Sequence, residues 1–325
     1  MANRKSRDNK IAALLINMGG PESLSAVRPF LCRLFSDRHV MDMPQPMRGL
    51  IARLISTFRT PKVRKRYEQI GGGSPLMKWT ECQAQMTERL LKNHYPFVSV
   101  GVAYSYVDPS IDAAIARFKS EGHGRIVALP LYPHYSFSTL GGIFGELEKA
   151  RMKYDLGERL VICAPFYKDT RYIEISASLA KNAIQKLDTA QPHRIVFTAH
   201  SLPVSFLLRG DPYQLQVKKN ARLLACQAGI ADYTLSFQSK VGPVEWIKPS
   251  TAETIREIGR VGIKQVAVIP IGFVCDNIET LHELDIELAE IAREVGIEHF
   301  VRGKVFNDSE PFARFLADYI IEANS

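Results

Sequence analysis

Eight short runs of apolar and β-branched residues recur along the chain, and segments with helical periodicity separate them. Most of the runs are apolar almost throughout rather than at alternate positions, which is typical of strands buried on both faces of a parallel sheet. The runs are IAALLINMG (11–19), VSVGVAYSY (98–106), RIVALPLYP (125–133), RLVICAPF (159–166), RIVFTAHS (194–201), YTLSFQS (233–239), QVAVIPIGF (265–273) and HFVRGKVFN (299–307).

Alternation of strands with amphipathic helices predicts βαβ units with right-handed crossovers. The eight strands divide into four and four, so we expect an α/β fold of two doubly wound lobes, residues 1–168 and 169–325. The last helical segment, 309–323, is expected to pack back across a lobe. In such folds ligands bind at the carboxyl ends of the strands.

Composition narrows the class of protein. The longest strictly apolar stretch lies within QVAVIPIGFVC (265–275) and is too short to span a membrane, and the basic start of the chain lacks the apolar core of a secretory signal. The five cysteines form no C-x-x-C pair, which favours a reducing compartment and a cytoplasmic location. The net charge of +8 favours anionic partners, but no zinc-finger or RNA-binding pattern points to nucleic acid.

One acidic segment stands out, DNIETLHELDIELAE (276–290), in which six of fifteen residues are Asp or Glu. At about 100° per residue, five of these carboxylates share an arc of roughly 80° on an α-helix. The opposite side predicts a core-facing stripe. The acidic face is either an ordinary solvated surface or a site for a cation or for proton transfer. The five carboxylates are Asp276, Glu279, Glu283, Glu287 and Glu290, and the stripe is Leu281, Leu284, Leu288, Ile291 and Val295.

Polar and aromatic residues follow the neighbouring strands. His200 and Ser201 end the fifth strand in FTAHSLP, and Trp246 follows the sixth in QSKVGPVEW. A lone histidine is often structural, but here a base, an aromatic side chain and a bank of carboxylates meet at one sheet edge, which indicates a functional site. The first strand lacks the G-x-G-x-x-G of a dinucleotide fold.

Six co-linear segments resemble ferrochelatase, the enzyme that inserts ferrous iron into protoporphyrin IX in the last step of haem synthesis. They are INMGGPESL, RTPKVRKRYEQIGGGSPL, LPLYPHYSFST, FTAHSLPVSFLLRGDPY, QSKVGPVEWIKPSTAETI and GFVCDNIETLHELDIE. The resemblance implies two Rossmann-like lobes with a porphyrin cleft between them. It also implies a lyase whose substrates are a porphyrin and Fe²⁺.

The resemblance assigns roles to individual residues. His200 matches the family's base or metal ligand, and Glu279 its catalytic, metal-binding glutamate. Glu283 and Glu287 match an acidic ridge of metal ligands on a helix with a π-type irregularity. The remaining carboxylates of that face, Asp276 and Glu290, are expected to be surface charges. Ring and propionate contacts match Met18, Arg59, Tyr67, Ser74, Tyr106 and Trp246, to which we add Ser201 beside the histidine.

The sequence also departs from the family pattern. Asn277 stands where members often have His, and His282 where they often have Tyr. Phe137 replaces the internal cysteine by which some members bind a 2Fe–2S cluster, and the chain ends at Ser325 without their extension, so we expect no cluster and no other cofactor. Ser105 replaces an arginine of some relatives.

The sequence leaves alternatives open for the substrate and for the class of activity. Met18, where coproporphyrin-type enzymes often carry Tyr, favours protoporphyrin. A coproporphyrin III ferrochelatase and a non-catalytic haem or porphyrin carrier are the competing interpretations. A carrier needs an iron ligand but no proton acceptor or acidic ridge.

The segment 43–62 has apolar residues at helical spacing with arginines beside them. This pattern is typical of an interfacial helix and predicts peripheral contact with the inner face of a membrane. Ordinary core packing is the alternative. The apolar residues are Met47, Leu50, Ile51, Leu54, Ile55 and Phe58, beside Arg48, Arg53 and Arg59.

Overall fold

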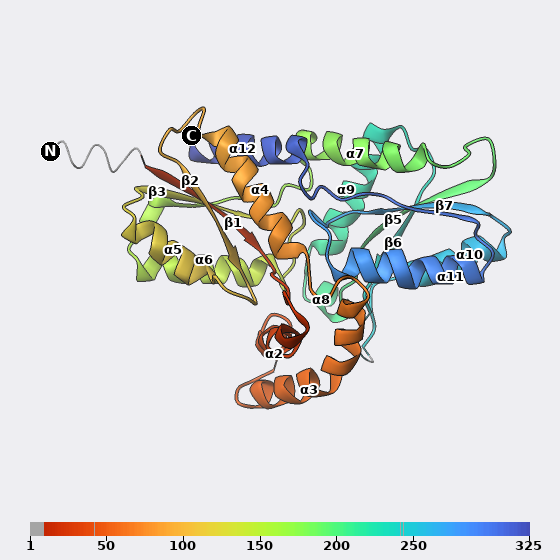
Figure 1. Cartoon of the computed structure of the whole chain (residues 1–325), viewed down its shortest axis with the longest axis horizontal. Coiled ribbons are helices and arrows are strands. Elements are labelled where there is room, and N and C mark those ends of the chain that lie inside the picture. The colour runs from red at the N-terminus through yellow and green to blue at the C-terminus, as the bar shows by residue number, and fades with distance from the viewer. Residues whose placement is uncertain (1–9, 42, 241, 243) are drawn as a thin grey trace. The chain divides into compact units, whose positions relative to one another are not determined.

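The computed structural model describes residues 10–41, 43–240, 242 and 244–325. The prediction that the basic start of the chain is not a secretory signal concerns the first nine residues, which lie outside the described part. The chain forms two compact units, whose elements are labelled in Figure 1. The first comprises the residues up to Tyr132, then Phe137–Pro165 and Asn307–Ser325. The second comprises Pro133–Ser136 and Phe166–Phe306.

The first unit is built on a four-stranded parallel sheet with the strand order β2-β1-β3-β4. All seven residues of β1 are buried, as expected for a central strand covered on both faces. The elements are β1 (Ile11–Asn17), β2 (Ser99–Tyr104), β3 (Arg125–Pro130), β4 (Leu160–Ile162), α4 (Leu76–Leu91), α5 (Ile111–Ser120), α6 (Leu140–Lys153) and α12 (Glu310–Asn324), with short 3₁₀ turns at Leu24–Ala26 and Gly157–Arg159.

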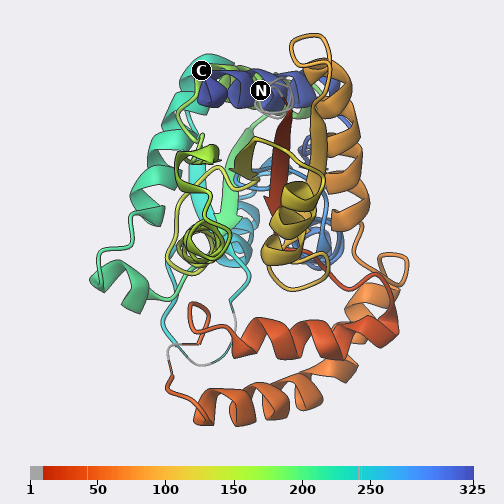
Figure 2. The same ribbon diagram turned by 90° about the vertical axis from the view of Figure 1, so that its left-hand side faces the viewer.

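Two helices of the first unit, α2 (Val27–Ser36) and α3 (Met47–Glu68), pack against each other. Figure 2 shows them side by side, away from the sheet. Only Ala52, Ser56, Thr60 and Tyr67 of α3 are buried. Small residues at four-residue spacing let α3 approach its neighbour closely, and much of the rest of the helix is left exposed.

The second unit repeats the same design, with the strand order β6-β5-β7-β8 and all strands parallel. Along β5 the side chains alternate: Ile195 and Phe197 pack with α7 and α9, whereas Val196 packs with α10 and the acidic helix. The elements are β5 (His193–His200), β6 (Thr234–Gln238), β7 (Gln265–Pro270), β8 (His299–Arg302), α7 (Thr170–Ile184), α8 (Val204–Leu208), α9 (Tyr213–Ala228), α10 (Thr251–Arg260), the π-helix η3 (Glu279–Leu288) and α11 (Ala289–Glu294).

Capping residues stabilise the first turn of several helices. At α10, the Ser250 hydroxyl accepts a hydrogen bond from the Glu253 amide while the Glu253 carboxylate accepts one from the Ser250 amide. This reciprocal capping box satisfies amide groups that a helix start leaves without partners. Each of the eight apolar runs corresponds to one strand, with β5 starting one residue before its run, and the predicted fold of two doubly wound parallel α/β lobes is confirmed.

The units differ from the expected residue ranges 1–168 and 169–325 in three places. Pro133–Ser136 belongs to the second unit, and the main crossover follows Pro165. The last helix, α12, belongs to the first unit, where it packs on α4. Phe312 and Leu316 of α12 are fully buried there, because α12 carries an apolar face that completes the core of the first unit.

Candidate functional site

His200 lies at the carboxyl end of β5, half-buried. Its ring Nδ1 lies 2.5 Å from the main-chain carbonyl oxygen of Ser201. A carbonyl can only accept, so Nδ1 carries the proton, and in the neutral ring Nε2 keeps its basic lone pair. The Tyr213 hydroxyl donates to the His200 carbonyl at 2.9 Å and anchors the backbone there. The imidazole is thus oriented as a proton acceptor or metal ligand through Nε2.

Gln238, at the end of β6, connects this strand edge to the acidic helix. It lies opposite His200 in the parallel register. Its side-chain amide donates to the Glu279 carbonyl at 3.1 Å and to Oε2 of Glu283 at 3.3 Å. Its own side-chain oxygen accepts from the Thr198 hydroxyl at 3.1 Å. Gln238 is therefore a buried connection between the histidine strand and the acidic helix. Sequence reasoning missed it, although a polar residue at the end of a predicted strand could have indicated it.

Ser239, the next residue, also holds the acidic helix. Its hydroxyl donates to the Glu283 carboxylate. Its backbone φ is +70°, a left-handed conformation that is uncommon for residues other than glycine. Such conformations persist where the surrounding structure fixes them, and they are frequent at functional sites. Two neighbouring donors, Gln238 and Ser239, thus orient one carboxylate of the ridge.

The acidic segment is wound as a π-helix over Glu279–Leu288, so the α-helical wheel drawn from the sequence is wrong here, while the implied π-type irregularity is present. In a π-helix the backbone bonds join residue i to i+5, and each turn is wider. Leu281, which we expected to face the core, is only half-buried, whereas the neighbouring His282 is buried. Nδ1 of His282 lies 3.7 Å from Oε1 of Glu287. Leu284 and Leu288 of the expected stripe are buried as predicted.

The charge of the segment is balanced from a distant strand. Arg302, at the end of β8, pairs with Asp276 at 3.1 Å and with Asp285 at 2.7 Å. We expected Asp276 to be a surface charge, which is wrong: its side chain is 14% exposed. Glu290 is exposed, as predicted.

Asn277 caps the start of the acidic helix. Its side-chain oxygen accepts from the Thr280 amide at 3.1 Å, and the Thr280 hydroxyl accepts from the Asn277 amide at the same distance. Asn277 is buried. The residue that replaces an imidazole of the family pattern therefore satisfies backbone groups of the helix start.

Trp246 and Ser201 meet on adjoining loops. Trp246 forms an isolated antiparallel bridge with Pro203, and the Ser201 hydroxyl donates to the Ile247 carbonyl at 3.3 Å. Ser201 is fully buried. Its hydrogen bond to Ile247 joins the loop after β5 to the loop that carries the half-buried Trp246.

In the first unit, three of the predicted substrate contacts gather where β1 and β2 end. The Tyr106 amide donates to the Met18 carbonyl at 3.1 Å, and a side chain at Gly20 would collide with Ser74. The Tyr106 hydroxyl donates to Asp37 at 2.8 Å. Burial, and then the Asp37 charge, raise the pKa of Tyr106, so the phenol stays protonated.

The other two predicted contacts lie on α3. Tyr67 is buried, and its carbonyl accepts from Gly72. Arg59 is half-buried, with its guanidinium 5.4 Å from the centre of the Phe35 ring. Burial, and then repulsion from Arg66, lower the pKa of Arg59. An anionic group bound there would relieve this repulsion.

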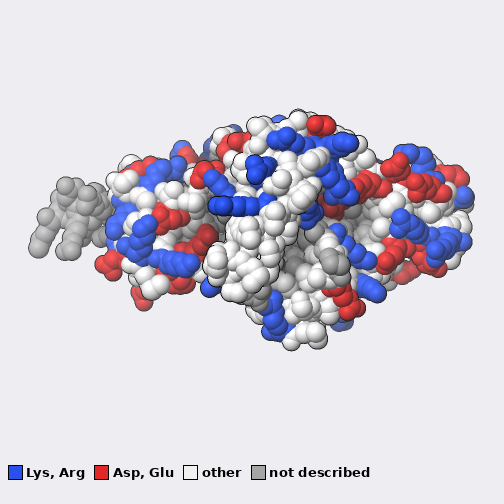
Figure 3. Space-filling view, turned by 90° about the horizontal axis from the view of Figure 1, so that it is seen from below, with Lys and Arg blue, Asp and Glu red and all other residues white. Residues whose placement is uncertain are grey.

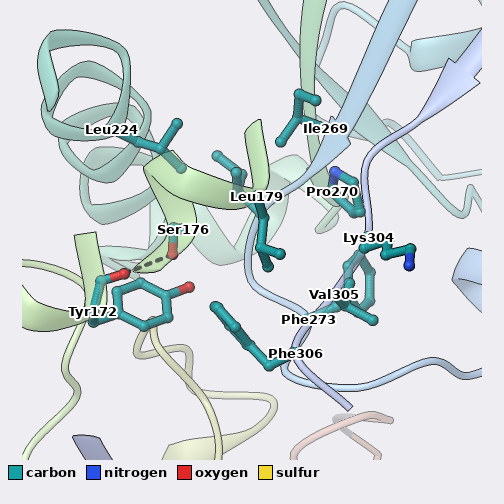
Figure 4. Close-up of a pocket in the computed structure, with 11 residues that line it drawn as sticks. Tyr172, Ser176, Leu179, Leu224, Ile269, Pro270, Phe273, Lys304, Val305 and Phe306 are labelled. Atoms are coloured by element: carbon teal, nitrogen blue, oxygen red, sulfur yellow. Dashed lines mark hydrogen bonds between the residues drawn. The ribbon is translucent and has the colours of Figure 1, made fainter. Parts of the chain in front are cut away.

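Two further observations limit what the described residues can bind. Among residues 10–41, 43–240, 242 and 244–325, no three His, Cys, Asp or Glu side chains are grouped so that they could hold a metal ion. A cavity in the second unit, between Tyr172, Phe273 and Phe306, has a volume of about 10 Å³ (Figure 4). That space suits a single water molecule and is far too small for a macrocycle.

The comparisons with known proteins agree on one family. The family model described as Ferrochelatase matches residues 10–324. A ferrochelatase of Gloeothece citriformis (strain PCC 7424) is 41% identical over 320 residues, 97% of this chain and 82% of that one. A ferrochelatase of Geotalea uraniireducens (strain Rf4) is 41% identical over 314 residues, 96% of this chain and 97% of that one.

Solved structures support the fold. SirB from Bacillus subtilis, solved with Fe³⁺, has a TM-score of 0.58 at 13% identity, covering 97% of this chain and 95% of that one. CbiX, described as the terminal enzyme of sirohaem biosynthesis in denitrifying bacteria, has a TM-score of 0.52 at 14% identity, covering 97% and 100%. At these identities the likeness shows a shared chelatase fold.

Proposed function

The chain belongs to the ferrochelatase family, enzymes that insert a metal ion into a porphyrin, and we propose that its substrates are Fe²⁺ and protoporphyrin IX and its product protohaem. The observation that carries the proposed mechanism is the hydrogen bond from Nδ1 of His200 to the Ser201 carbonyl. It directs the basic Nε2 away from the backbone, as a proton acceptor requires.

Insertion exchanges one Fe²⁺ for the two protons of the pyrrole N–H groups. We propose that Nε2 of His200 accepts a pyrrole proton and that the Glu279 carboxylate, at the start of the acidic helix, serves as the second acceptor. Gln238 supports this pairing, because it lies beside His200 on the neighbouring strand and donates to the Glu279 carbonyl. The end of the histidine strand and the start of the acidic helix are thereby held next to each other.

Glu283 and Glu287 continue from Glu279 along the same helix. Carboxylates and imidazoles are suitable ligands for ferrous iron. We propose that these residues, with His200 and Glu279, bind iron in succession rather than as one closed set. The support is that Glu283 is held by Gln238 and Ser239 while Glu287 lies near His282, so the carboxylates face different partners.

On the first unit, we propose that Met18, Tyr106 and Ser74 contact the macrocycle and that Arg59 and Tyr67 serve its propionates. The clustering of the first three around the β1 end supports the former. The repulsion between Arg59 and Arg66 supports the latter, because it favours an anion. Met18 supports protoporphyrin over coproporphyrin III, because a thioether gives the ring an apolar neighbour.

We further propose that α3 contacts a membrane surface peripherally. Met47, Leu50, Leu54 and Phe58 are 50–79% exposed on this helix. Figure 3 shows uncharged surface bordered by Lys and Arg side chains in the region of α2 and α3. Apolar residues beside arginines suit an interface with anionic lipid. In the described part of the chain, no helix combines the length and apolar character needed to cross a bilayer.

For cofactors, we propose that the protein works without an iron–sulfur cluster. Phe137 offers no ligand at the position of the internal cysteine in cluster-binding relatives. Protein purified under anaerobic conditions should then lack the broad visible absorption of such clusters. A stoichiometric iron and sulfide content in that protein would overturn the proposal.

Anaerobic turnover tests the function. Ferrous iron and protoporphyrin IX are added to the pure protein, and the loss of porphyrin fluorescence is followed. We expect a rate well above the protein-free control and a higher kcat/KM with protoporphyrin IX than with coproporphyrin III. A rate equal to the control with stoichiometric binding would instead identify a carrier, and the reverse substrate order a coproporphyrin enzyme.

A further inference from the structure

Arg302 holds the acidic helix at two places. Its Nη1 lies 3.1 Å from Oδ1 of Asp276, just before the helix, and its Nε and Nη2 donate to the two oxygens of Asp285 at 2.8 and 2.7 Å. The Arg302 and Asp276 side chains are 13% and 14% exposed, so that contact is largely removed from water, whereas the Asp285 side chain is 34% exposed. The pair with Asp285 has two parallel hydrogen bonds, which makes it the more directional of the two.

The fork geometry matches the unusual winding of the helix. Asp276 precedes the helix, whereas Asp285 lies six residues after Glu279, the first residue of the π-helix. An α-helix turns by about 100° per residue, and the wider π-helix, in which residue i bonds to i+5, turns by less. A change from π to α winding would therefore rotate Asp285 about the helix axis and away from the guanidinium that also holds Asp276.

We propose that Arg302 is a positioning residue that selects the π winding of Glu279–Leu288 and so sets the direction of the Glu279 and Glu283 side chains. The ten-residue π-helix is otherwise surprising, because such winding is usually confined to a single turn. Glu279 and Glu283 both lie between the two residues that Arg302 holds. If this contact is lost, the segment is free to rewind as an α-helix, and Glu283 turns away from Ser239.

The charge of Arg302 is secure in this role. Burial lowers the pKa of Arg302, but its hydrogen bonds to Asp285 and the charge of Asp276 outweigh burial and raise that pKa. Strand register explains its reach: Arg302 lies opposite Val268 near the end of β7, the strand that leads into the acidic helix. The placement of the site carboxylates is therefore tied to the end of β8.

The experiment compares Arg302→Gln and Arg302→Lys with the wild type. Lysine keeps the charge but lacks the planar fork, so it cannot bridge both carboxylates in the same way. We expect amide hydrogen exchange over 279–288 to accelerate at least about tenfold in both variants. We expect kcat to fall at least about tenfold, with a higher KM for Fe²⁺ and unchanged porphyrin affinity, because small misplacements of reacting groups are costly.

Two controls separate positioning from stability. Arg314→Gln removes an exposed pair with Glu310 on α12 and should change neither exchange nor kinetics. The triple variant Arg302→Met, Asp276→Asn, Asp285→Asn removes the three paired charges together, including the largely shielded Arg302 and Asp276, so its thermal stability should recover while kcat stays low. Full recovery of kcat in the triple variant, or wild-type exchange and kinetics in Arg302→Gln, would overturn the proposal.

The inference rests on the proposed function for its kinetic part only. Hydrogen exchange over 279–288 is measured without substrate, so it tests the control of winding even if the wild-type protein shows no turnover. Accelerated exchange in an inactive wild-type background would reject the proposed function and keep the role of Arg302 in winding. Unchanged exchange in the Arg302 variants of an active protein would reject the role of Arg302 in winding and keep the proposed function.

Discussion

The side-chain amide of Gln238 donates a hydrogen bond to the main-chain carbonyl of Glu279 at 3.1 Å. Gln238 ends a strand, whereas Glu279 starts the helix that follows another strand. Since His200 lies opposite Gln238 in the sheet register, this one contact fixes the acidic helix relative to the histidine.

Replacement of Gln238 by Leu should lower kcat by roughly tenfold while porphyrin affinity stays within about twofold. The buried hydrogen bonds to Glu279 and Glu283 are lost, and a bond to a charged group contributes about 1.5–3 kcal/mol. Steady-state turnover and fluorescence-detected porphyrin binding measure the two effects. Gln227→Leu, on the exposed surface of α9, is the control and should leave both unchanged. Normal kcat in Gln238→Leu would assign the residue to fold stability alone.

Replacement of His200 by Ala should lower kcat by about 10²–10⁴-fold, the usual contribution of a general base, with porphyrin binding retained. Glu279→Ala should act in the same direction. His193→Ala is a matched control, because His193 begins the same strand and its Nδ1 likewise lies 3.0 Å from a backbone carbonyl, that of Gln191. Near-normal turnover in either test variant would reassign the catalytic role.

His134 should make the protein lose stability in acid. It is 3% exposed, and burial lowers its pKa to about 3. The unfolded chain, with a histidine pKa near 6.5, therefore binds the proton first. The free energy of unfolding is therefore highest with respect to this group above about pH 6.5. It decreases as the pH falls from 6.5 towards 3, with a slope of at most about 1.4 kcal/mol per pH unit.

Urea unfolding between pH 7 and pH 4 measures that effect of His134. The free energy of unfolding should fall less steeply with pH in His134→Gln than in the wild type, even though the variant starts from lower stability. His94→Gln, at an exposed position, should keep the wild-type slope. Parallel curves for His134→Gln and the wild type would show that another group carries the acid sensitivity.

The exposed face of α3 should bind anionic vesicles at low salt. In Leu54→Ser, Phe58→Ser the bound fraction should drop at least tenfold, because each apolar side chain contributes about 1.5–3 kcal/mol when buried. Flotation in a density gradient measures the bound fraction. Leu208→Ser, at an 84% exposed position on α8, is the control. Absence of wild-type binding at low salt would leave this face without a membrane role.

Much of the fold could be read from the sequence, because burial on both faces forces a strand to be apolar almost throughout. The eight runs correspond to the eight strands, and His200 was singled out because it ends a strand at the sheet edge to which Trp246 and the acidic segment were also assigned. The last helix shows the limit of this reasoning. The periodicity of α12 predicts a helix with an apolar face, but not which core that face completes.

The sequence by itself determined two parallel α/β lobes, a histidine at a strand end and a bank of carboxylates after a neighbouring strand. Only the tertiary structure decided how those carboxylates are aimed. A helical wheel assumes a fixed turn of about 100° per residue, which the π winding breaks. The Arg302 contacts with Asp276 and Asp285 arise from strand register between β7 and β8, and the Gln238 contacts from register between β5 and β6. Such pairings join residues far apart in the chain, so no local pattern encodes them.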